Sequence, residues 1–198
     1  RGVSAWWEGS AGAGSGSSRA GTAARRCRVA VTSGAHSGGE AGDVAAGCGA
    51  VTFGAPLGDA DALLFESAVV PRYLSFFASL AVQMLLPFSP AKIAHLGCRV
   101  GYPHIDIAER FPESVIVGVD SSEAAIALAR SRGEGVPGAT LEYIVGEGLP
   151  RGMELGSFTH ALAIHPMGGP DERARILSDL QRLLLPGGQA VFALPVRG

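Results

Sequence analysis

The fold is decided by residues 92–101, which read Lys-Ile-Ala-His-Leu-Gly-Cys-Arg-Val-Gly. The first half has the apolar pattern of a short buried strand, and the second half places two glycines directly after it. Glycine allows the backbone to bend sharply and to approach a ligand with no side chain in between. The stretch therefore predicts a β-strand over residues 92–96 that leads into a ligand-binding turn.

Beyond this turn, apolar runs alternate with helical patterns. We expect helices over residues 103–111, 121–132 and 170–184, and strands over residues 115–119, 141–145, 158–164 and 189–194. Strands that are apolar throughout and separated by amphipathic helices predict a Rossmann-like, doubly wound, mostly parallel sheet with helices on both faces. Such sheets bind ligands beyond the carboxyl ends of their strands, where the strand order reverses.

The part before residue 92 divides into two. Residues 1–57 are rich in Gly, Ala and Ser and predict a flexible tail or linker, while residues 58–198 form the folded domain. Pro71 is suited to open a helix that ends before Pro87. Its inward face would consist of Leu74, Phe77, Ala81, Met84 and Leu85. On the later helix, the expected inward face is Ile176, Leu177, Leu180, Leu183 and Leu184.

Composition excludes several classes of partner. The net charge of −2 gives no global attraction to nucleic acid. The longest apolar run, residues 76–86, is far shorter than the ~20 residues that span a bilayer, so no membrane association is expected. Three cysteines without a Cys-x-x-Cys pair, and no secretory signal, favour a reducing, cytoplasmic location. Because the chain begins with Arg1, we expect it to be part of something longer.

Asp120 ends the second strand of the series, 23 residues after Gly97. An acid about twenty residues after a glycine turn accepts hydrogen bonds from ribose hydroxyls in dinucleotide-binding folds. The order of strand, glycine turn, helix, strand and terminal Asp therefore predicts a cofactor that contains adenosine.

Six segments in a fixed order resemble the motifs of class I S-adenosylmethionine-dependent methyltransferases. They are residues 95–102, 108–112, 117–122, 145–148, 157–158 and 185–188, and the likeness extends over residues 65–196. The resemblance implies S-adenosylmethionine as cofactor. It implies that the amino-acid end of the cofactor is bordered by Gly97, Cys98, Arg99 and Gly101. Asp120 would border the ribose, and the adenine would lie against Ser121, Glu147 and Gly148. The methyl donor and the substrate would be met by Ile164 and His165.

Three residues depart from the family pattern. His95 stands where the family usually has an acid that fixes the glycine loop and the amino group of the donor. Arg99 replaces a glycine, and Thr159 replaces an acid common in the fourth strand. Arg99 has two interpretations: it points to solvent while its backbone serves the ligand, or its side chain fills the pocket or binds a carboxylate or phosphate.

Sharper alternatives are less well supported by spacing. One alternative is a metal site formed by His95, Cys98, His160 and His165. Residues 160 and 165 are five apart at a strand end, not four apart on a helix, so their spacing does not favour a metal site. A nucleophilic Cys98 would need a positioned base and a lowered pKa. A nicotinamide dehydrogenase would need a third glycine that is not evident after Gly101.

Two functional hypotheses remain open. In the first, the protein transfers a methyl group to a small-molecule acceptor, with His165 as a substrate-side base. In the second, the domain is a degenerate ligand-binding or protein-interaction module, as His95, Arg99 and Thr159 suggest. The sixth and seventh strands of the family sheet are not found, so we expect a partner or a further segment to complete that edge.

Overall fold

The computed structural model describes residues 31–33, 51–53, 56–166 and 170–194. Two three-residue strands, β1 (Val31–Ser33) and β2 (Val51–Phe53), pair in parallel within the stretch for which a flexible tail is predicted. The rest of that stretch, up to residue 55, lies outside the described residues. Leu57 is buried and its carbonyl accepts a hydrogen bond from Ser122 Oγ (2.7 Å), so this residue packs with the domain.

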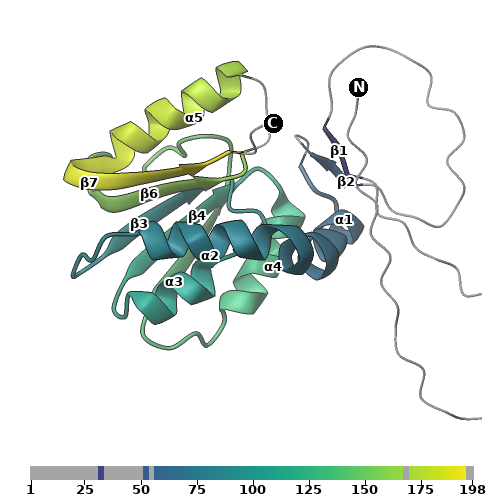
Figure 1. Ribbon diagram of the computed structural model, residues 1–198, viewed down its shortest axis with the longest axis horizontal. Helices are drawn as coiled ribbons and strands as arrows, with labels where there is room; N and C mark the ends of the chain where they lie inside the picture. Colours follow the sequence, from purple (N-terminus) through teal and green to yellow (C-terminus); the bar gives the residue numbers. More distant parts are fainter. Residues whose placement is uncertain (1–30, 34–50, 54–55, 167–169, 195–198) are drawn as a thin grey trace, which may run out of the picture.

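A five-stranded parallel sheet forms the centre of the domain (Figure 1), as predicted. Its strands lie in the order β5 (Thr140–Val145), β4 (Val115–Asp120), β3 (Lys92–Leu96), β6 (Phe158–Ile164) and β7 (Leu184–Ala193). The strand order reverses between β3 and β6, because the chain passes from β3 outward to β5 and then returns to β6. A ligand site is therefore expected beyond the carboxyl ends of β3 and β6.

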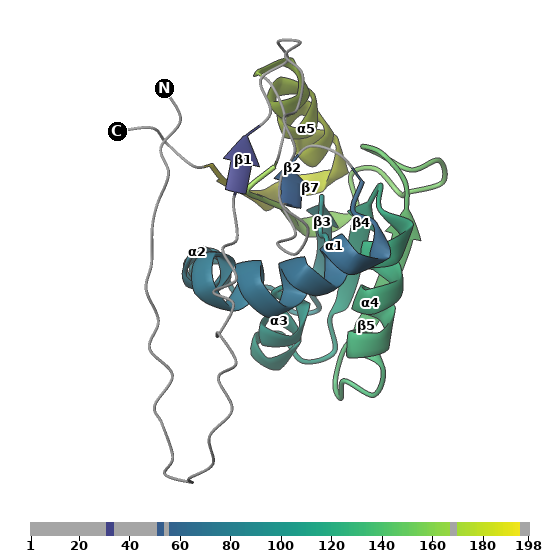
Figure 2. The same ribbon diagram turned by 90° about the vertical axis from the view of Figure 1, so that its right-hand side faces the viewer.

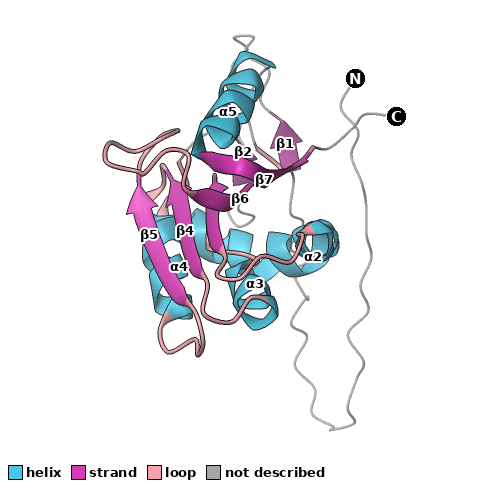
Figure 3. Cartoon of the chain, turned by 90° about the vertical axis from the view of Figure 1, so that its left-hand side faces the viewer, coloured by secondary structure: helices cyan, strands magenta, loops and turns pink. Residues whose placement is uncertain are grey.

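Helices cover both faces of the sheet (Figure 3). On one side lie α2 (Ser75–Met84), α3 (His104–Arg110) and α4 (Glu123–Gly133), and on the other lies α5 (Pro170–Leu183). Alternate residues of β3 divide between two cores: Ile93 packs with α2 and α3, and Ala94 packs on the α5 side. This alternation is the two-residue period of a strand buried on both faces.

A single helix from Asp59 to Met84 runs along the domain, with α1 at one end and α2 at the other (Figure 2). It consists of α1 (Asp59–Leu64), a π-helical segment η1 (Phe65–Leu74) and α2. The prediction that Pro71 opens this helix is wrong, because Pro71 lies inside η1. The wider π turns accommodate the proline, and Arg72 Nη1 donates to Ser67 O (3.3 Å), the carbonyl that an α-helical residue 71 would have used.

Within the described residues, that helix is long and apolar enough to cross a membrane by length and composition alone, with 28% of its most apolar window buried. The core helix of a soluble protein meets the same test, so this is weak evidence. With 26 residues, the helix is nevertheless longer than the apolar run of residues 76–86 that was considered from the sequence. Its exposed apolar residues on the outer face include Phe76, Leu80 and Met84.

Two of the predicted inward faces need correction. Met84 is 63% exposed, because the buried face of α2 follows Ala78, Ala81, Val82 and then Leu85. Likewise Leu177 of α5 is 45% exposed, and Leu180 and Leu183 carry the contact with the sheet. In both helices the apolar pattern was wider than the face that the sheet covers.

The end of α5 also differs from expectation. Sequence predicts a turn at residues 186–188 and a strand from 189, but β7 begins at Leu184 directly after the helix. A register shift between Phe158 and His160 absorbs the Pro-Gly-Gly sequence as an irregularity of β7, with Gly187 at φ 85°. Beyond β7, the described residues contain no further strand of this sheet.

Candidate functional site

The glycine turn begins where β3 ends and is held by the neighbouring strand. The N–H groups of Gly97 and Cys98 both donate to Val119 O, at 2.8 and 3.0 Å. Gly97 (φ 71°) and Gly101 (φ 75°) adopt left-handed backbone conformations that favour glycine. A Cβ added at Gly97 would meet no heavy atom within 4 Å, so the backbone here borders open space.

Arg99 shares this left-handed conformation (φ 50°) although it is not glycine. Its backbone N–H donates to Asp120 Oδ2 at 2.9 Å, and its Nε lies 3.9 Å from the same oxygen. The N–H of Ser122 donates to the other oxygen, Oδ1, at 2.9 Å. Asp120 therefore fixes both the glycine turn and the start of α4, where Ser122 is the N-cap.

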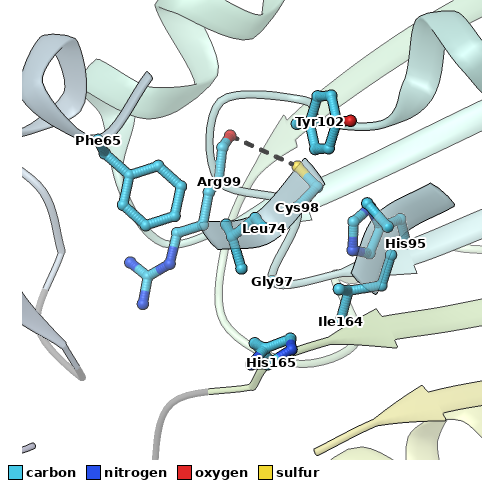
Figure 4. Close-up of a pocket in the computed structure, with 10 residues that line it drawn as sticks. Phe65, Leu74, His95, Gly97, Cys98, Arg99, Tyr102, Ile164 and His165 are labelled. Atoms are coloured by element: carbon cyan, nitrogen blue, oxygen red, sulfur yellow. Dashed lines mark hydrogen bonds between the residues drawn. The ribbon is translucent and has the colours of Figure 1, made fainter. Parts of the chain in front are cut away.

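A pocket lies beyond the carboxyl ends of β3 and β6 (Figure 4), at the position where the strand order reverses. Its lining comes from the turn after β3, from the end of β6 and from the N-terminal helix: Phe65, Leu74, Ala78, His95, Gly97, Cys98, Arg99, Tyr102, Ile164 and His165. Its cavity holds ≈ 20 Å³, room for about one water molecule.

Two buried histidines and the half-buried Tyr143 form a hydrogen-bonded chain behind this pocket. His95 Nδ1 lies 3.0 Å from His104 Nε2, and His104 Nδ1 lies 3.1 Å from the Tyr143 hydroxyl. His95 Nε2, which belongs to a pocket-lining residue, has no hydrogen-bond partner among the described residues. Burial lowers the pKa of His95 to about 4, and burial, His95 and Arg132 lower that of His104, so both rings are neutral near pH 7.

His165 follows β6 and lines the opposite side of the pocket. Its backbone is left-handed (φ 51°) and its N–H donates to Ala193 O at 2.9 Å, which fixes the residue against β7. Its ring packs against those of Tyr73 and Phe77, with centroid distances of 5.5 and 4.7 Å, and these two rings also contact each other. Neither ring nitrogen has a partner in the described structure, and burial lowers the pKa. A neutral, unpaired imidazole of this kind can accept a proton.

Cys98 lines the same pocket but is not built as a nucleophile. Burial, followed by the charge of Asp120, raises the pKa of the Cys98 thiol well above its usual range. Within the part of the chain that the structure describes, the only hydrogen bond of the thiol is the one that it donates to the Arg99 carbonyl, at 3.8 Å. The thiol therefore stays protonated, which favours the structural interpretation of this residue.

The pocket brings together five of the predicted site residues: Gly97, Cys98, Arg99, Ile164 and His165. The other five do not line it. Gly101 faces the Tyr143 hydroxyl and Ala129, and Asp120 is buried beneath the turn with Ser121 after it. In the loop after β5, Glu147 is exposed and Gly148 lies against Asp179 of α5. Their roles toward the adenosine end of a cofactor stay predictions.

The residues considered for a metal site have other uses in the fold. His160 donates from Nε2 to Leu86 O at 2.8 Å, and its ring packs against Phe88 and Phe111. Thr159 exchanges hydrogen bonds with the backbone of Lys92, at 2.9 Å in both directions. Among the described residues, no group of three or more His, Cys, Asp or Glu is arranged to hold a metal ion.

Sequence reasoning missed the contribution of the N-terminal helix and of two polar residues, the buried His104 and the half-buried Tyr143. Phe65 and Leu74 pack on Val100 and close one side of the pocket. The sequence places Leu74 on a helix face that packs against the sheet, and it gives Phe65 no role. His104 and Tyr143 carry no local motif, and only the fold brings them to His95.

The fold and the glycine turn together define a Rossmann-like, cofactor-binding domain, and comparisons with known proteins specify it. Residues 93–188 match the family model described as a methyltransferase domain. Trans-aconitate 2-methyltransferase of Acidovorax sp. (strain JS42) is 31% identical over 134 residues, covering 66% of this chain and 50% of that protein. Demethylmenaquinone methyltransferase of Thermus thermophilus is 28% identical over 146 residues, covering 67% of this chain and 66% of that protein.

Solved structures agree on the fold. The methyltransferase in complex with the Trm112 methyltransferase activator of Haloferax volcanii has a TM-score of 0.57 at 19% identity, over 69% of this chain and 59% of that one. Geranyl diphosphate C-methyltransferase from Streptomyces coelicolor, solved with S-adenosyl-L-homocysteine, has a TM-score of 0.53 at 20% identity, over 68% and 49%. In sequence and in fold, the domain is similar to the class I S-adenosylmethionine-dependent methyltransferases. The chain spans about half the length of the trans-aconitate methyltransferases it matches.

The residues at the pocket fit the cofactor of this family, S-adenosylmethionine. The Gly97 backbone borders open space, and buried ring nitrogens of His95 and His165 lack partners among the described residues. The cavity of ≈ 20 Å³ is smaller than the several hundred Å³ typical of ligand pockets. Phe65 and Leu74 of the N-terminal helix close one side of this cavity.

Proposed function

We propose that this protein transfers the methyl group of S-adenosylmethionine to a small-molecule acceptor. The observation that carries the proposal is the pocket at the reversal of strand order, where the glycine turn after β3 faces His165 after β6. The glycine turn is suited to border the cofactor, and His165 is suited to meet the acceptor. The match of residues 93–188 to a methyltransferase domain supports the same activity.

In this proposal the chain acts by alignment, by excluding water and by accepting a proton. When bound, S-adenosylmethionine supplies an activated methyl group on a sulfonium. Alignment of two reactants in a closed site accounts for much of the rate of such displacements. Phe65 and Leu74 exclude water from the pocket, and His165, neutral and unpaired, accepts the proton that the acceptor loses.

The acceptor side favours a flat or apolar molecule. Tyr73 and Phe77 pack against His165. Among the described residues that line the pocket, only Arg99 carries a charge. Since the Arg99 guanidinium lies beside Asp120, its charge is partly neutralised. The relatives include enzymes named for trans-aconitate and for demethylmenaquinone. The aromatic rings of Tyr73 and Phe77, which pack against the pocket-lining His165, favour the second kind of acceptor over a polycarboxylate.

A second function is supported by the contact between Arg99 and Asp120. With Arg99 over its carboxylate, Asp120 is only 4% exposed. If this arrangement persists in solution, the domain is a binding or protein-interaction module that retains the family fold. The outer edge of β7, which pairs with no other described strand, is where a partner or a further segment would add. A cytoplasmic location is part of the proposal in either case.

Transfer of a labelled methyl group tests the first function. The full chain is incubated with methyl-labelled S-adenosylmethionine and either trans-aconitate or a short-chain demethylmenaquinone analogue. We expect label in the quinone-type acceptor, and a drop of about 10²-fold or more in the His165→Asn variant, whose binding of S-adenosylhomocysteine is retained. Absence of transfer to either acceptor, together with absence of S-adenosylhomocysteine binding by the folded chain, favours the interaction module.

A further inference from the structure

The helix from Asp59 to Met84, with the two residues after it, is apolar on two faces in its C-terminal half. Ala81, Val82 and Leu85 belong to the inner face, where they are at most 8% exposed and pack in the core with the sheet and α3. The other face carries five large apolar side chains that are 45% to 66% exposed: Tyr73, Phe76, Leu80, Met84 and Leu86. We name these five residues the outer stripe. A helix that is apolar on all sides is normally covered on all sides, so the outer stripe is expected to meet a partner.

The outer stripe is a continuous and fixed surface. Phe76, Leu80 and Met84 follow one another at intervals of four residues, so they lie in one row along α2. In Figure 1, α2 lies in front of the sheet, and no other described helix or strand covers its outer side. The end of the helix is held by Gln189 of β7, whose side chain donates to Met84 O (2.9 Å) and accepts from the Leu86 N–H (2.8 Å). The stripe therefore belongs to the rigid part of the domain.

Charge is nearly absent around the outer stripe. Residues 67–91 contain one charged residue, Arg72, and its Nη1 donates to Ser67 O at 3.3 Å. The exposed polar residues Arg72, Ser79 and Gln83 accompany the stripe. An apolar centre with a polar rim is the composition of a protein–protein interface. Helices that lie on anionic membranes carry several Lys or Arg residues, so a single arginine favours a protein partner over a lipid surface.

The size and the shape of the outer stripe fit a second copy of the same chain. A large apolar side chain covers on the order of 200 Å², so five of them at these exposures present about 500 Å². Two copies face to face would bury about 1,000 Å², the lower limit for a specific interface. Rows of side chains four residues apart interdigitate with an identical row in the commonest class of helix packing. Because the stripe itself is uncharged, two copies meet without repulsion.

We infer that the outer stripe is the interface of a two-fold homodimer, in which α2 packs against α2 of a second copy. The inference concerns this surface and does not rest on the proposed function. The interface lies directly behind the aromatic side of the pocket: Tyr73 belongs to the stripe, and its ring contacts that of His165 at 5.5 Å. Phe76 contacts Phe77, which also packs against His165. Dimer formation therefore holds the helix whose rings support His165.

Sedimentation velocity on the full chain, at roughly 1 to 100 µM, tests the inference. We expect the wild type to pass from monomer to dimer over this range. Leu80→Arg places a charge at the middle of the stripe, opposite its own copy, and should weaken the dimer by about 100-fold or more. Leu177→Arg is the matched control, because Leu177 is also 45% exposed but lies on α5, on the other face of the sheet. It should dimerise as the wild type does, after circular dichroism has shown both variants to be folded.

A mixture of two variants separates the interface from an effect on folding. Leu80→Arg and Leu80→Glu should each be monomeric alone and should form a mixed dimer together, because residue 80 then meets the opposite charge across the two-fold axis. Failure of the mixture to dimerise would overturn the two-fold arrangement.

Three other results would overturn the inference. The first is a wild type that stays monomeric over the whole range. The second is an equal effect of Leu80→Arg and Leu177→Arg on the dimer. The third is monomeric wild type that sediments with phosphatidylcholine and phosphatidylglycerol vesicles while Leu80→Arg does not, which would assign the stripe to a lipid surface.

Discussion

Arg99 and Asp120 are joined twice: the Arg99 backbone N–H donates to Asp120 Oδ2 at 2.9 Å, and Arg99 Nε lies 3.9 Å from the same oxygen. With Ser122 N–H on the other oxygen, the carboxylate ties the glycine turn to the start of α4. An acid expected to hold a ribose is thus also the residue that shapes the turn. Its two roles give the first prediction.

Asp120→Asn should destabilise the domain by about 2 kcal/mol, because a buried amide cannot accept from both backbone N–H groups and loses a charged acceptor. Urea unfolding followed by circular dichroism measures the change. Glu142→Gln, an equivalent charge removal at an exposed residue of β5, is the control and should change the free energy of unfolding by less than about 0.5 kcal/mol. Equal stability of the two variants would contradict the anchoring role of Asp120.

Arg99→Gly should raise the affinity for S-adenosylhomocysteine. The substitution keeps the backbone N–H on Asp120, removes the guanidinium from the pocket, and relieves a left-handed conformation that costs a non-glycine residue about 1 kcal/mol. Calorimetry on the variant and the wild type gives the ratio of dissociation constants. Weaker binding by Arg99→Gly would show that the guanidinium holds the carboxylate of the ligand, the other interpretation of this residue.

Gly118→Ala should be strongly destabilising, by about 1–3 kcal/mol. The added Cβ would lie 2.7 Å from His104 Cε1 and 2.8 Å from Cys98 Sγ, and both are buried in the body of the domain. Gly146→Ala is the matched control, since its nearest neighbour would be Pro150 at 3.7 Å, an ordinary contact. The two midpoints of thermal unfolding should differ by several degrees, and coincident midpoints would argue against a tightly packed histidine chain.

Acid should unfold the domain before most of its carboxylates are protonated. The folded-state pKa of His95 is about 4, below its value of 6.5 when exposed, so the unfolded chain binds more protons between these limits. Stability is therefore full above pH 6.5 and falls as the pH drops to about 4, by about 3 kcal/mol from His95 alone. His104 adds in the same direction. Urea unfolding at several pH values measures the slope, which should be shallower in His95→Asn. A flat profile in the wild type would be incompatible with buried neutral histidines.

Strands 92–96 and 158–164 could be predicted residue for residue, because apolar runs bounded by turn residues have few alternatives. The glycine turn and the place of the site followed from the parallel order of the strands. Local rules failed at Pro71, where a π-helical segment accommodates a residue that normally opens a helix. They also gave no means of placing Phe65 at the pocket, because its position depends on a helix that packs across the sheet.

The histidine chain shows the same limit more sharply. His104 lies nine residues from His95 and Tyr143 lies on the edge strand β5, so no spacing rule relates them. The structure shows that His95 is a buried, hydrogen-bonded residue. The sequence could not indicate that the second ring nitrogen of His95 is left without a partner among the described residues, because that depends on which groups the fold brings to each side of the ring.

The central claim is that the pocket between the ends of β3 and β6 binds the methyl donor, and calorimetric titration with S-adenosylhomocysteine tests it most directly. Wild-type protein and Asp120→Asn are titrated side by side, after circular dichroism has shown both to be folded. The account predicts saturable binding of one ligand per chain to the wild type and a large loss in the variant. Absence of binding by the folded wild type, or equal binding by the two proteins, would contradict it.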